Sequence, residues 1–427
     1  MLAPALRRQI QTHNGSPVLN SWFESSVRGL YFVGFASLNS FGHRYRFVAG
    51  CKAAAPRVVR SIARERGRVR VTSLRPRAKH AIARAVSLTG LDARAAARMH
   101  RDVPFTVSYH SVVEKLNGNA RSSLPAMRIS AAMLEQHLDW LARNFEIVSL
   151  DQLGRNGNGG GKSRPLAAVT FDDGYSDVYY HAFPILKRKG IPAAIFVVTD
   201  LVGTPEPPIH ERLYSLLSKA LRSALTQQQL VGIIHDVNHG IAKESLEEIA
   251  ADPFDMTRFL LRALDQTAVL QIMKRLSEYV PAETEWPRDL QPLSWEMLAE
   301  MRAAGMTIGS HSRTHAFLAK ESDERARDET ATSRRVLYEN LGAPAEVFSY
   351  PGGSFNRSVI RAVADAGYRY AFTDCNHRDA EYPLLTLPRK TMWERSCVDP
   401  SGAFSPEIMS CHALSMFERF SDCSGDH

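Results

Sequence analysis

The 427-residue sequence has no apolar run that approaches the length a membrane-spanning helix needs, which is about 20 residues. Its best candidate, residues 30–41, is interrupted by glycine, serine and asparagine and lies too far from the N-terminus for a signal peptide. Cysteine is also scarce: the five cysteines are odd in number and show no CxxC spacing, which predicts neither a disulfide framework nor a thiolate zinc site. We therefore expect free thiols and a cytoplasmic protein.

Acidic residues are nearly missing from the first quarter of the chain. Residues 1–101 contain 19 Lys and Arg against 3 acidic residues, a net charge of +16, whereas residues 102–427 contain 34 basic and 42 acidic residues and carry −8. Because no DNA- or RNA-binding motif accompanies the basic residues, we expect no nucleic-acid partner. The basic segment is typical of a poorly ordered or peripheral region, and its roles could include organellar targeting or peripheral association with a membrane surface.

From residue 105 onward, short apolar runs alternate with amphipathic stretches, a pattern typical of α/β domains. Continuously apolar runs such as LAAVTF, residues 166–171, indicate parallel strands buried on both faces. Helices are predicted between the strands, one of them with Ser130 as its N-cap. Strands are predicted over 105–109, 145–150, 166–171, 193–198, 306–309, 347–350, 370–373 and 384–388.

One long stretch, residues 201–292, interrupts this alternation because it has helical patterns but no strand signal, and we interpret it as a helical insertion or lid. The predicted organisation has five parts. They are a basic N-terminal segment, poorly ordered or helical, over 1–100, the first part of the α/β domain over 104–200, the insertion over 201–292, the second part over 293–395, and a C-terminal tail over 396–427.

Side chains capable of acid–base or metal chemistry follow several predicted strands. Asp172 and Asp173 follow one strand, and His110, His311 and Arg389 each lie at or just beyond the end of another. The carboxyl ends of parallel strands share one face of a sheet or barrel, and binding sites form on that face. We therefore expect these side chains to lie close together.

The spacing of the histidines and aspartates points to a metal site. His311 and His315, four residues apart, can point the same way at a turn and bind one ion. Neighbouring side chains of an extended chain alternate in direction, so Asp172 and Asp173 are expected to have different roles. One completes a two-histidine, one-carboxylate site while the other accepts a proton from an attacking water. The same ligands also fit a non-haem iron oxygenase, and a plain turn would also explain Asp-Asp-Gly.

Three segments carry a resemblance to a known family. TFDDG at 170–174, SHSRTH at 310–315 and FSYPGG at 348–353 resemble, in this order, the first three motifs of the polysaccharide deacetylases, carbohydrate esterase family four. The resemblance extends from Phe105 to Arg389 outside the insertion. It implies a distorted (β/α)7 barrel, and a hydrolase that uses a divalent metal, Zn²⁺ in the first place, to remove N-acetyl groups from an N-acetylated glycan.

The resemblance also implies roles for the matching residues. Asp172 corresponds to the general base, and the metal ligands correspond to Asp173, His311 and His315. The third motif implies substrate contacts from Tyr350, Pro351 and Gly352, although Tyr350 stands where the family usually has an arginine. We predict that Arg389 replaces that arginine by pairing with Asp172 and keeping it ionised. The alternatives are a surface arginine and an arginine paired with Asp374.

The family usually has its general acid, a histidine, after a leucine-rich strand late in the sequence. The matching segment here, LLTLPR at residues 384–389, has no histidine. Members that act on poly-N-acetylglucosamine take the acid from a tyrosine-histidine pair after the first strand, and Tyr109-His110 resembles that pair, so His110 is the predicted acid. Two alternatives remain: an amidase or deformylase of the same fold that acts on a small amide, and a catalytically weakened glycan-binding relative. The sequence predicts no oligomeric state.

Overall fold

The computed structural model describes residues 104–116, 123–124, 127–150, 153 and 164–416 except 224 and 284, together with residues 12–13, 16–17, 80 and 83–84. The chain divides into two units, Met1–Ala81 and Ile82–His427. In the first unit, β1 (Thr12–His13) pairs antiparallel with β2 (Ser16–Pro17). The segment predicted over 1–100 lies otherwise almost wholly outside the described residues; residues 80, 83 and 84 are helical.

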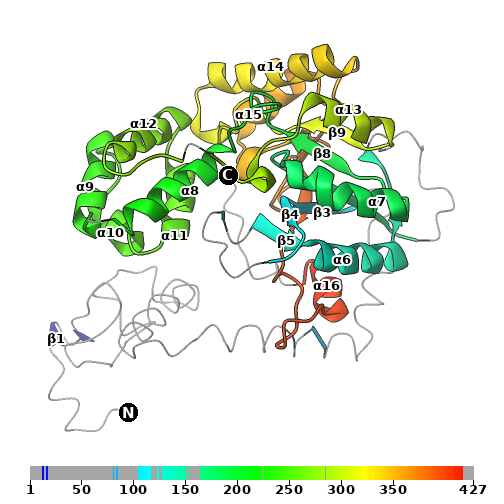
Figure 1. Cartoon of the computed structure of the whole chain (residues 1–427), viewed down its shortest axis with the longest axis horizontal. Helices are drawn as coiled ribbons and strands as arrows, with labels where there is room; N and C mark the ends of the chain where they lie inside the picture. The colour runs from blue at the N-terminus through cyan, green and yellow to red at the C-terminus, as the bar shows by residue number, and fades with distance from the viewer. Residues whose placement is uncertain are drawn as a thin grey trace, which may run out of the picture. The chain divides into compact units, whose positions relative to one another are not determined.

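Seven parallel strands of the second unit close into a barrel (Figure 1). β7 pairs with β3 to close the ring, and β6 (Glu146–Ile147) adds to the start of β7. The structure thus confirms the predicted α/β barrel. In order around the ring, the strands are β3 (Phe105–Tyr109), β12 (Leu387–Thr391), β11 (Tyr370–Thr373), β10 (Val347–Ser349), β9 (Thr307–Ser310), β8 (Ala194–Val197) and β7 (Leu166–Phe171).

The apolar strands supply two separate cores because their side chains alternate in direction. Alternate residues such as Ala168, Phe196 and Phe372 form one cluster. Their neighbours, such as Val169 and Ile195, join a second, larger cluster with the surrounding helices. This double burial explains why the strands are continuously apolar rather than alternating with polar residues.

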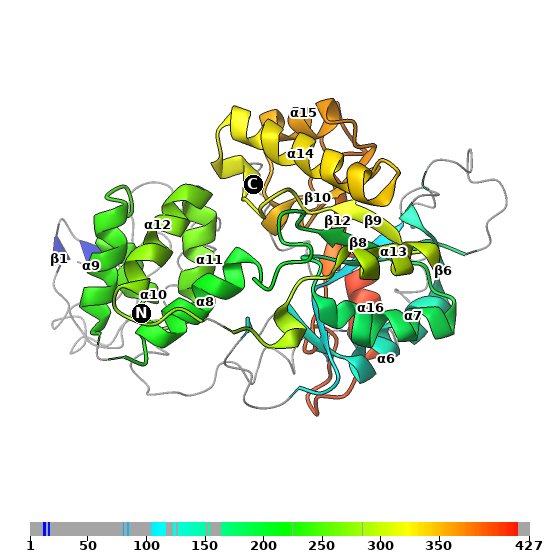
Figure 2. The same cartoon turned by 45° about the horizontal axis from the view of Figure 1, so that its top comes forward.

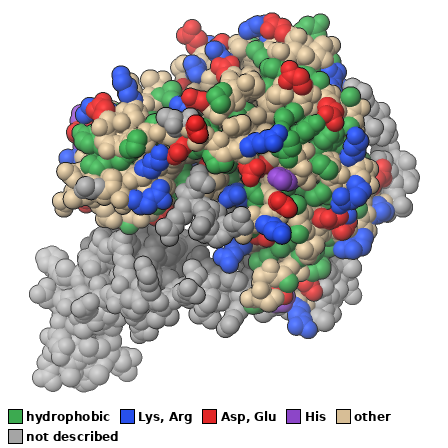
Figure 3. Space-filling model, in the orientation of Figure 1, with side chains coloured by type: hydrophobic (Ala, Val, Ile, Leu, Met, Phe, Trp, Pro, Cys, Tyr) green, Lys and Arg blue, Asp and Glu red, His purple; other side chains and the backbone are tan. Residues whose placement is uncertain are grey.

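Helices surround the barrel, as Figure 2 shows. Ser130 caps the first of them by accepting a hydrogen bond from Met133 N, as the sequence predicts. On the face seen in Figure 3, basic and acidic side chains are interspersed. The covering helices are α6 (Ala131–Asn144), α7 (Phe183–Lys189), α13 (Trp295–Ala303), α14 (Asp323–Leu341) and α15 (Arg357–Asp365).

Two strands differ from their predicted bounds by more than one residue at an end. β12 covers Leu387–Thr391 rather than 384–388, because Thr386 Oγ1 bonds to Tyr382 O and to Asp379 N in a turn that delays the strand. Arg389 therefore lies within the strand, opposite Thr106 of β3, and not after it. β6 is shorter than the predicted 145–150, because β8 takes over the same edge of β7 from Thr170 onward.

Within the predicted insertion 201–292, residues 209–280 fold as a bundle with their own apolar core, beside the barrel in Figures 1 and 2. Val202 and Leu290, near the ends of the insertion, pack into the barrel core instead. Fully buried leucines such as Leu217, Leu246 and Leu276 lie at its centre. Within the described residues, no helix has the length and apolar character needed to cross a membrane. The helices of the bundle are α8 (Ile209–Ala220), α9 (Gln227–Val237), α10 (Lys243–Ile249), α11 (Pro253–Ala263) and α12 (Gln266–Ser277).

The described part of the predicted C-terminal tail, up to residue 416, packs onto the barrel domain. α16 (Pro406–Ala413) begins after Ser405, whose side chain accepts a hydrogen bond from Ile408 N. Its buried residues Ile408, Met409 and Cys411 belong to the larger core cluster. These residues are therefore an integral part of the domain.

Candidate active site

The predicted catalytic side chains gather at the carboxyl end of the barrel. Asp172 follows β7, His311 follows β9, and His110 follows β3. Arg389 reaches the same place from within β12. Asp172, His311 and Arg389 are each no more than 2% exposed. Distant parts of the sequence therefore meet in one buried polar cluster.

Asp172 forms a two-point ion pair with Arg389. Nη1 and Nη2 of the arginine donate to Asp172 Oδ1 and Oδ2, each over 2.7 Å, and Ser349 Oγ lies 3.3 Å from Oδ2. Burial alone would raise the pKa of Asp172, but the charges of Arg389 and His311 outweigh it and hold the pKa below its ordinary value. Asp172 is therefore ionised at neutral pH. The structure places Arg389 against this carboxylate, where the sequence predicts it.

Asp173 faces imidazoles instead. Nε2 of His315 and of His311 lie 3.1 and 3.4 Å from Asp173 Oδ1, and Nε2 of His210 lies 3.5 Å from Oδ2. Neither carboxylate oxygen has a hydrogen-bond partner within the described part of the chain. Burial would raise the pKa of Asp173, but the three imidazoles hold it well below its ordinary value. The two adjacent aspartates thus point to different partners.

Unusual backbone angles occur where the side chains of Asp172 and Asp173 turn toward different partners. Asp173, Ser312 and His315 have φ angles of 68°, 63° and 65°, and Ser415 is the only other non-glycine residue of the described ranges in this left-handed region. Such conformations are costly and cluster at functional sites. Gly174 also has a positive φ, 69°, and an added Cβ would lie 2.9 Å from Val197 Cγ1. The chain is therefore bent sharply where the site residues emerge.

The donor set fits a divalent metal ion. Ligand atoms of Asp173, His210 and His315 lie within 4.8 Å of one another and are buried. The predicted ligand His311 is not part of this group, although its Nε2 lies 3.4 Å from Asp173 Oδ1. Donors at about 2.0–2.1 Å from a tetrahedral ion are about 3.3 Å apart, close to the nitrogen–oxygen distances around Asp173. Ser349 O lies 2.8 Å from His311 Nδ1, which directs Nε2 of that ring toward Asp173. These residues could hold a metal ion, although its identity is not fixed by the donors.

His210 is the site residue that the sequence analysis missed. It lies in the first turn of α8, in the insertion, and burial lowers its pKa to about 3, so the ring is neutral. Its Nε2 is 2.8 Å from the hydroxyl of Tyr175. The neighbouring Glu211 is fully buried, and burial raises its pKa to about 7. A single histidine in a helical stretch carries no spacing signal that could have identified it.

His110 stands at the edge of the same cluster. It directly follows β3 and is half-buried. Its Nδ1 is buried without a hydrogen-bond partner among the described residues. The backbone N–H of Asp172 donates to Tyr109 O over 2.9 Å, so His110 follows a residue that is bonded directly to Asp172. The position suits proton transfer near Asp172.

The third motif has mainly a packing role in the structure. Tyr350 is fully buried and its hydroxyl donates to Leu385 O over 3.0 Å. Pro351 is buried as well, and Gly352 alone of the three is exposed. The side chain of Phe317 occupies the place where a Cβ of Gly352 would lie. Of the predicted substrate contacts, only Gly352 therefore presents surface to a ligand.

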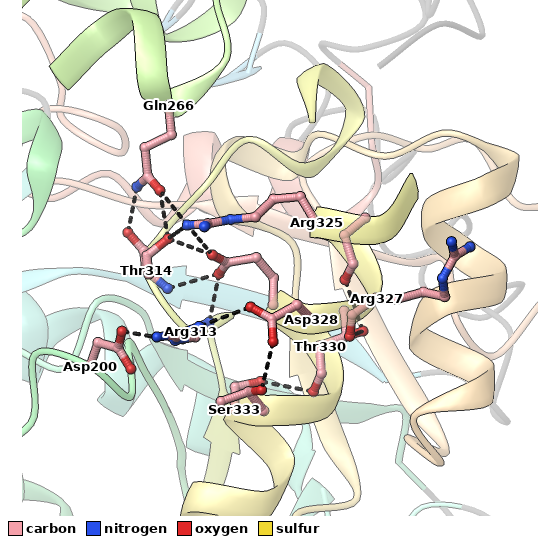
Figure 4. A network of polar contacts seen from close by, with 12 residues as sticks. Asp200, Gln266, Arg313, Thr314, Arg325, Arg327, Asp328, Thr330 and Ser333 are labelled. Carbon is pink, nitrogen blue, oxygen red and sulfur yellow. Dashed lines mark hydrogen bonds and ion pairs between the residues drawn. The ribbon is translucent and has the colours of Figure 1, made fainter. Parts of the chain in front are cut away.

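The loop that carries both motif histidines is held from two sides (Figure 4). The buried carboxylate of Glu329 accepts hydrogen bonds from Arg313 N, Thr314 N and Thr314 Oγ1 over 2.9, 2.8 and 2.6 Å. From the insertion, Gln266 Nε2 donates to Thr314 O over 2.8 Å. Arg313 pairs with Asp200 and Asp328. The loop is thus fixed between α14 and the insertion.

Comparison with known proteins agrees with this geometry. Residues 159–371 match the family model described as polysaccharide deacetylase. The Bacillus subtilis (strain 168) protein YxkH is 31% identical over 267 residues, 62% of this chain and 62% of that protein. The poly-beta-1,6-N-acetyl-D-glucosamine N-deacetylase of Escherichia coli (strain K12) is 37% identical over 102 residues, 23% of this chain and 14% of that enzyme.

Among solved structures, the Streptococcus pyogenes deacetylase PplD in complex with acetate is similar, with a TM-score of 0.44 and 17% identity over 71% of this chain and 97% of that one. The chain spans less than two thirds of the length of the two curated relatives above. The family match covers the strands that carry Asp172, Asp173, His311 and His315. The chain therefore belongs to the polysaccharide deacetylase family.

Proposed function

We propose that the protein is a metal-dependent hydrolase that removes N-acetyl groups from an N-acetylated glycan. One observation carries this proposal: two adjacent buried carboxylates, one paired with Arg389 and the other facing imidazole nitrogens at 3.1–3.5 Å. Such a division suits one base and one metal ligand. The family membership and the N-deacetylase from Escherichia coli support an N-acetylated glycan as the substrate.

In this proposal Asp173, His311 and His315 hold a divalent cation, with Zn²⁺ expected first. When bound, the cation supplies Lewis acidity, which polarises the acetamide carbonyl and makes water a better nucleophile at neutral pH. Asp172 accepts a proton from the attacking water. Arg389, which donates to both oxygens of Asp172, keeps the carboxylate ionised and oriented.

His110 completes the reaction as the general acid. The water oxygen forms a bond to the carbonyl carbon, and the carbon–nitrogen bond then breaks. His110 gives a proton to the departing nitrogen, so the products are acetate and a free amino sugar. His110 is half-buried and directly follows Tyr109, whose carbonyl oxygen accepts a hydrogen bond from Asp172 N, and this position supports the role.

Metal content and acetate release from the purified full-length protein test the proposal. We expect one divalent ion per chain and acetate release from N-acetylglucosamine oligomers. His311→Ala should lose both the ion and the activity, whereas His110→Ala should keep the ion and lose the activity. Undiminished activity in His110→Ala would exclude His110 as the acid. Hydrolysis of small amides without acetate release from glycans would favour the amidase alternative.

A further inference from the structure

We propose that His210 is a fourth protein ligand of a five- or six-coordinate cation, which keeps open positions for water and substrate, so that the helical insertion forms part of the metal centre. This role rests on the metal site proposed above and adds to it a ligand from outside the barrel. His210 lies in α8, whereas Asp173, His311 and His315 follow barrel strands. The insertion would then be a structural component of the site and not only a cover over it.

Around Asp173, the ligand atoms of Asp173, His210 and His315 lie within 4.8 Å of one another, and His311 must move inward to join this group on one cation. His311 and His315 approach Oδ1, and His210 approaches Oδ2 from the other side. The ring of His315 lies between the other two, with centroids 4.8 Å from His210 and 4.9 Å from His311. Both oxygens of this buried carboxylate lack a hydrogen bond from any described residue. A cation shared by the four side chains would satisfy both oxygens.

A second set of contacts holds His210 in position. The fully buried carboxylate of Glu211 accepts hydrogen bonds from Ser123 Oγ, Leu124 N and Tyr175 Oη over 2.8, 3.2 and 3.3 Å. Tyr175 follows Asp173 by two residues, and its hydroxyl lies 2.8 Å from His210 Nε2, the nitrogen that also faces Asp173, so this hydrogen bond must be given up when Nε2 binds the cation. The first turn of α8 is therefore bound to the same turn of the barrel that carries Asp173.

The insertion reaches the metal-binding loop at a second point. Gln266, in the first turn of α12, bonds through both side-chain atoms to Thr314, which directly precedes His315 (Figure 4). Gln266 N also donates to Glu321 Oε1 over 2.7 Å. The insertion thus contacts the barrel beside Asp173 and beside His315, the two residues that His210 faces. Its position is suited to supplying a ligand.

Cobalt titration of the full-length protein tests the role of His210. The protein is stripped with a chelator and titrated with Co²⁺, whose visible absorption reports the number and geometry of its ligands. We expect His210→Ala and His210→Gln to lose more Co²⁺ affinity than the about 10- to 100-fold that is typical when a residue behind a ligand is removed, and to show altered absorption bands. His239→Ala, an exposed histidine of the same insertion, should match the unaltered protein.

A measurement on the unaltered protein covers the case in which both His210 variants unfold. In the Co²⁺-loaded protein, the paramagnetically shifted imidazole N–H resonances count the histidine ligands. Three such resonances support the proposal, and two overturn it. Unchanged affinity and absorption in folded His210 variants would also overturn it. If the unaltered protein binds no Co²⁺, or if His311→Ala and His315→Ala bind it normally, the metal site of the proposed function fails instead.

Discussion

The barrel rim and the helical insertion contribute buried polar side chains to the same site, but they hold them differently. On the rim, Asp172 and His311 directly follow strands whose backbones are paired on both edges. In the insertion, His210 depends on a few side-chain bonds from Glu211 and Tyr175. Changes on the rim should therefore alter chemistry or the whole fold, whereas changes at the insertion contacts should mainly alter how well the site is assembled.

The largest effect is expected for the proposed base on the rim. Asp172→Asn should lower kcat for acetate release by about 10²- to 10⁴-fold, because the amide cannot accept the proton from water. Metal content should not change, because Asp172 faces Arg389 rather than the histidines. Steady-state kinetics and metal analysis of the same preparation measure both. A variant that retains full activity would remove Asp172 from the mechanism.

Arg389→Met should destabilise the protein by about 3–5 kcal/mol, because it leaves the buried carboxylate of Asp172 without its partner. Urea unfolding measures the difference in free energy. Arg357→Met is the matched control, since Arg357 pairs with Glu381 at the surface and should cost no more than about 1 kcal/mol. Equal losses in the two variants would mean that the buried Asp172–Arg389 pair contributes no more to the free energy of unfolding than the exposed Arg357–Glu381 pair.

The buried His137 of the barrel domain should contribute to the pH dependence of stability. Burial lowers the pKa of His137 in α6 to about 4, below the ordinary 6.5. Between these values the His137 ring is protonated in the unfolded chain but not in the folded protein, so its contribution to stability falls by about 3 kcal/mol as the pH falls from about 6.5 to 4. Urea unfolding at several pH values should show a flatter profile for His137→Gln. His239→Gln in the insertion should leave the profile unchanged.

The smallest effect is expected at the second insertion contact. Gln266→Ala removes the bonds to Thr314 and should cost about 1 kcal/mol in urea unfolding. It should also weaken metal binding, because Thr314 directly precedes His315. Gln228→Ala, an exposed glutamine of α9, is the control and should change neither quantity. Unchanged metal affinity in Gln266→Ala would separate this contact from the metal centre.

The site residues differ in how far the sequence predicts them, and the reasons are physical. Strand periodicity and the strand-end rule lead to Asp172, His311 and the barrel itself, because both depend on local backbone patterns. These local patterns do not predict the start of β12, because hydrogen bonds of the Thr386 side chain determine where the strand begins. They do not predict His210 either, because its position depends on how the insertion packs against the barrel.

Tyr350 shows a different limit. The motif places it next to the site, but its side chain turns into the apolar core between Phe348 and Phe355, which no spacing in the sequence reveals. Its hydroxyl then bonds to Leu385 O. A match to a motif therefore locates a segment of backbone more securely than it locates the direction of each side chain.

Acetate release from N-acetylglucosamine oligomers, measured on the same full-length preparation before chelation, after chelation and after Zn²⁺ is restored, tests the central claim most directly. We predict equal amounts of acetate and free amine before chelation, none after it, and recovery with Zn²⁺. Asp173→Ala should stay inactive throughout. Undiminished acetate release by the chelated protein, or no release from any N-acetylated glycan by protein that carries its metal, would contradict the account.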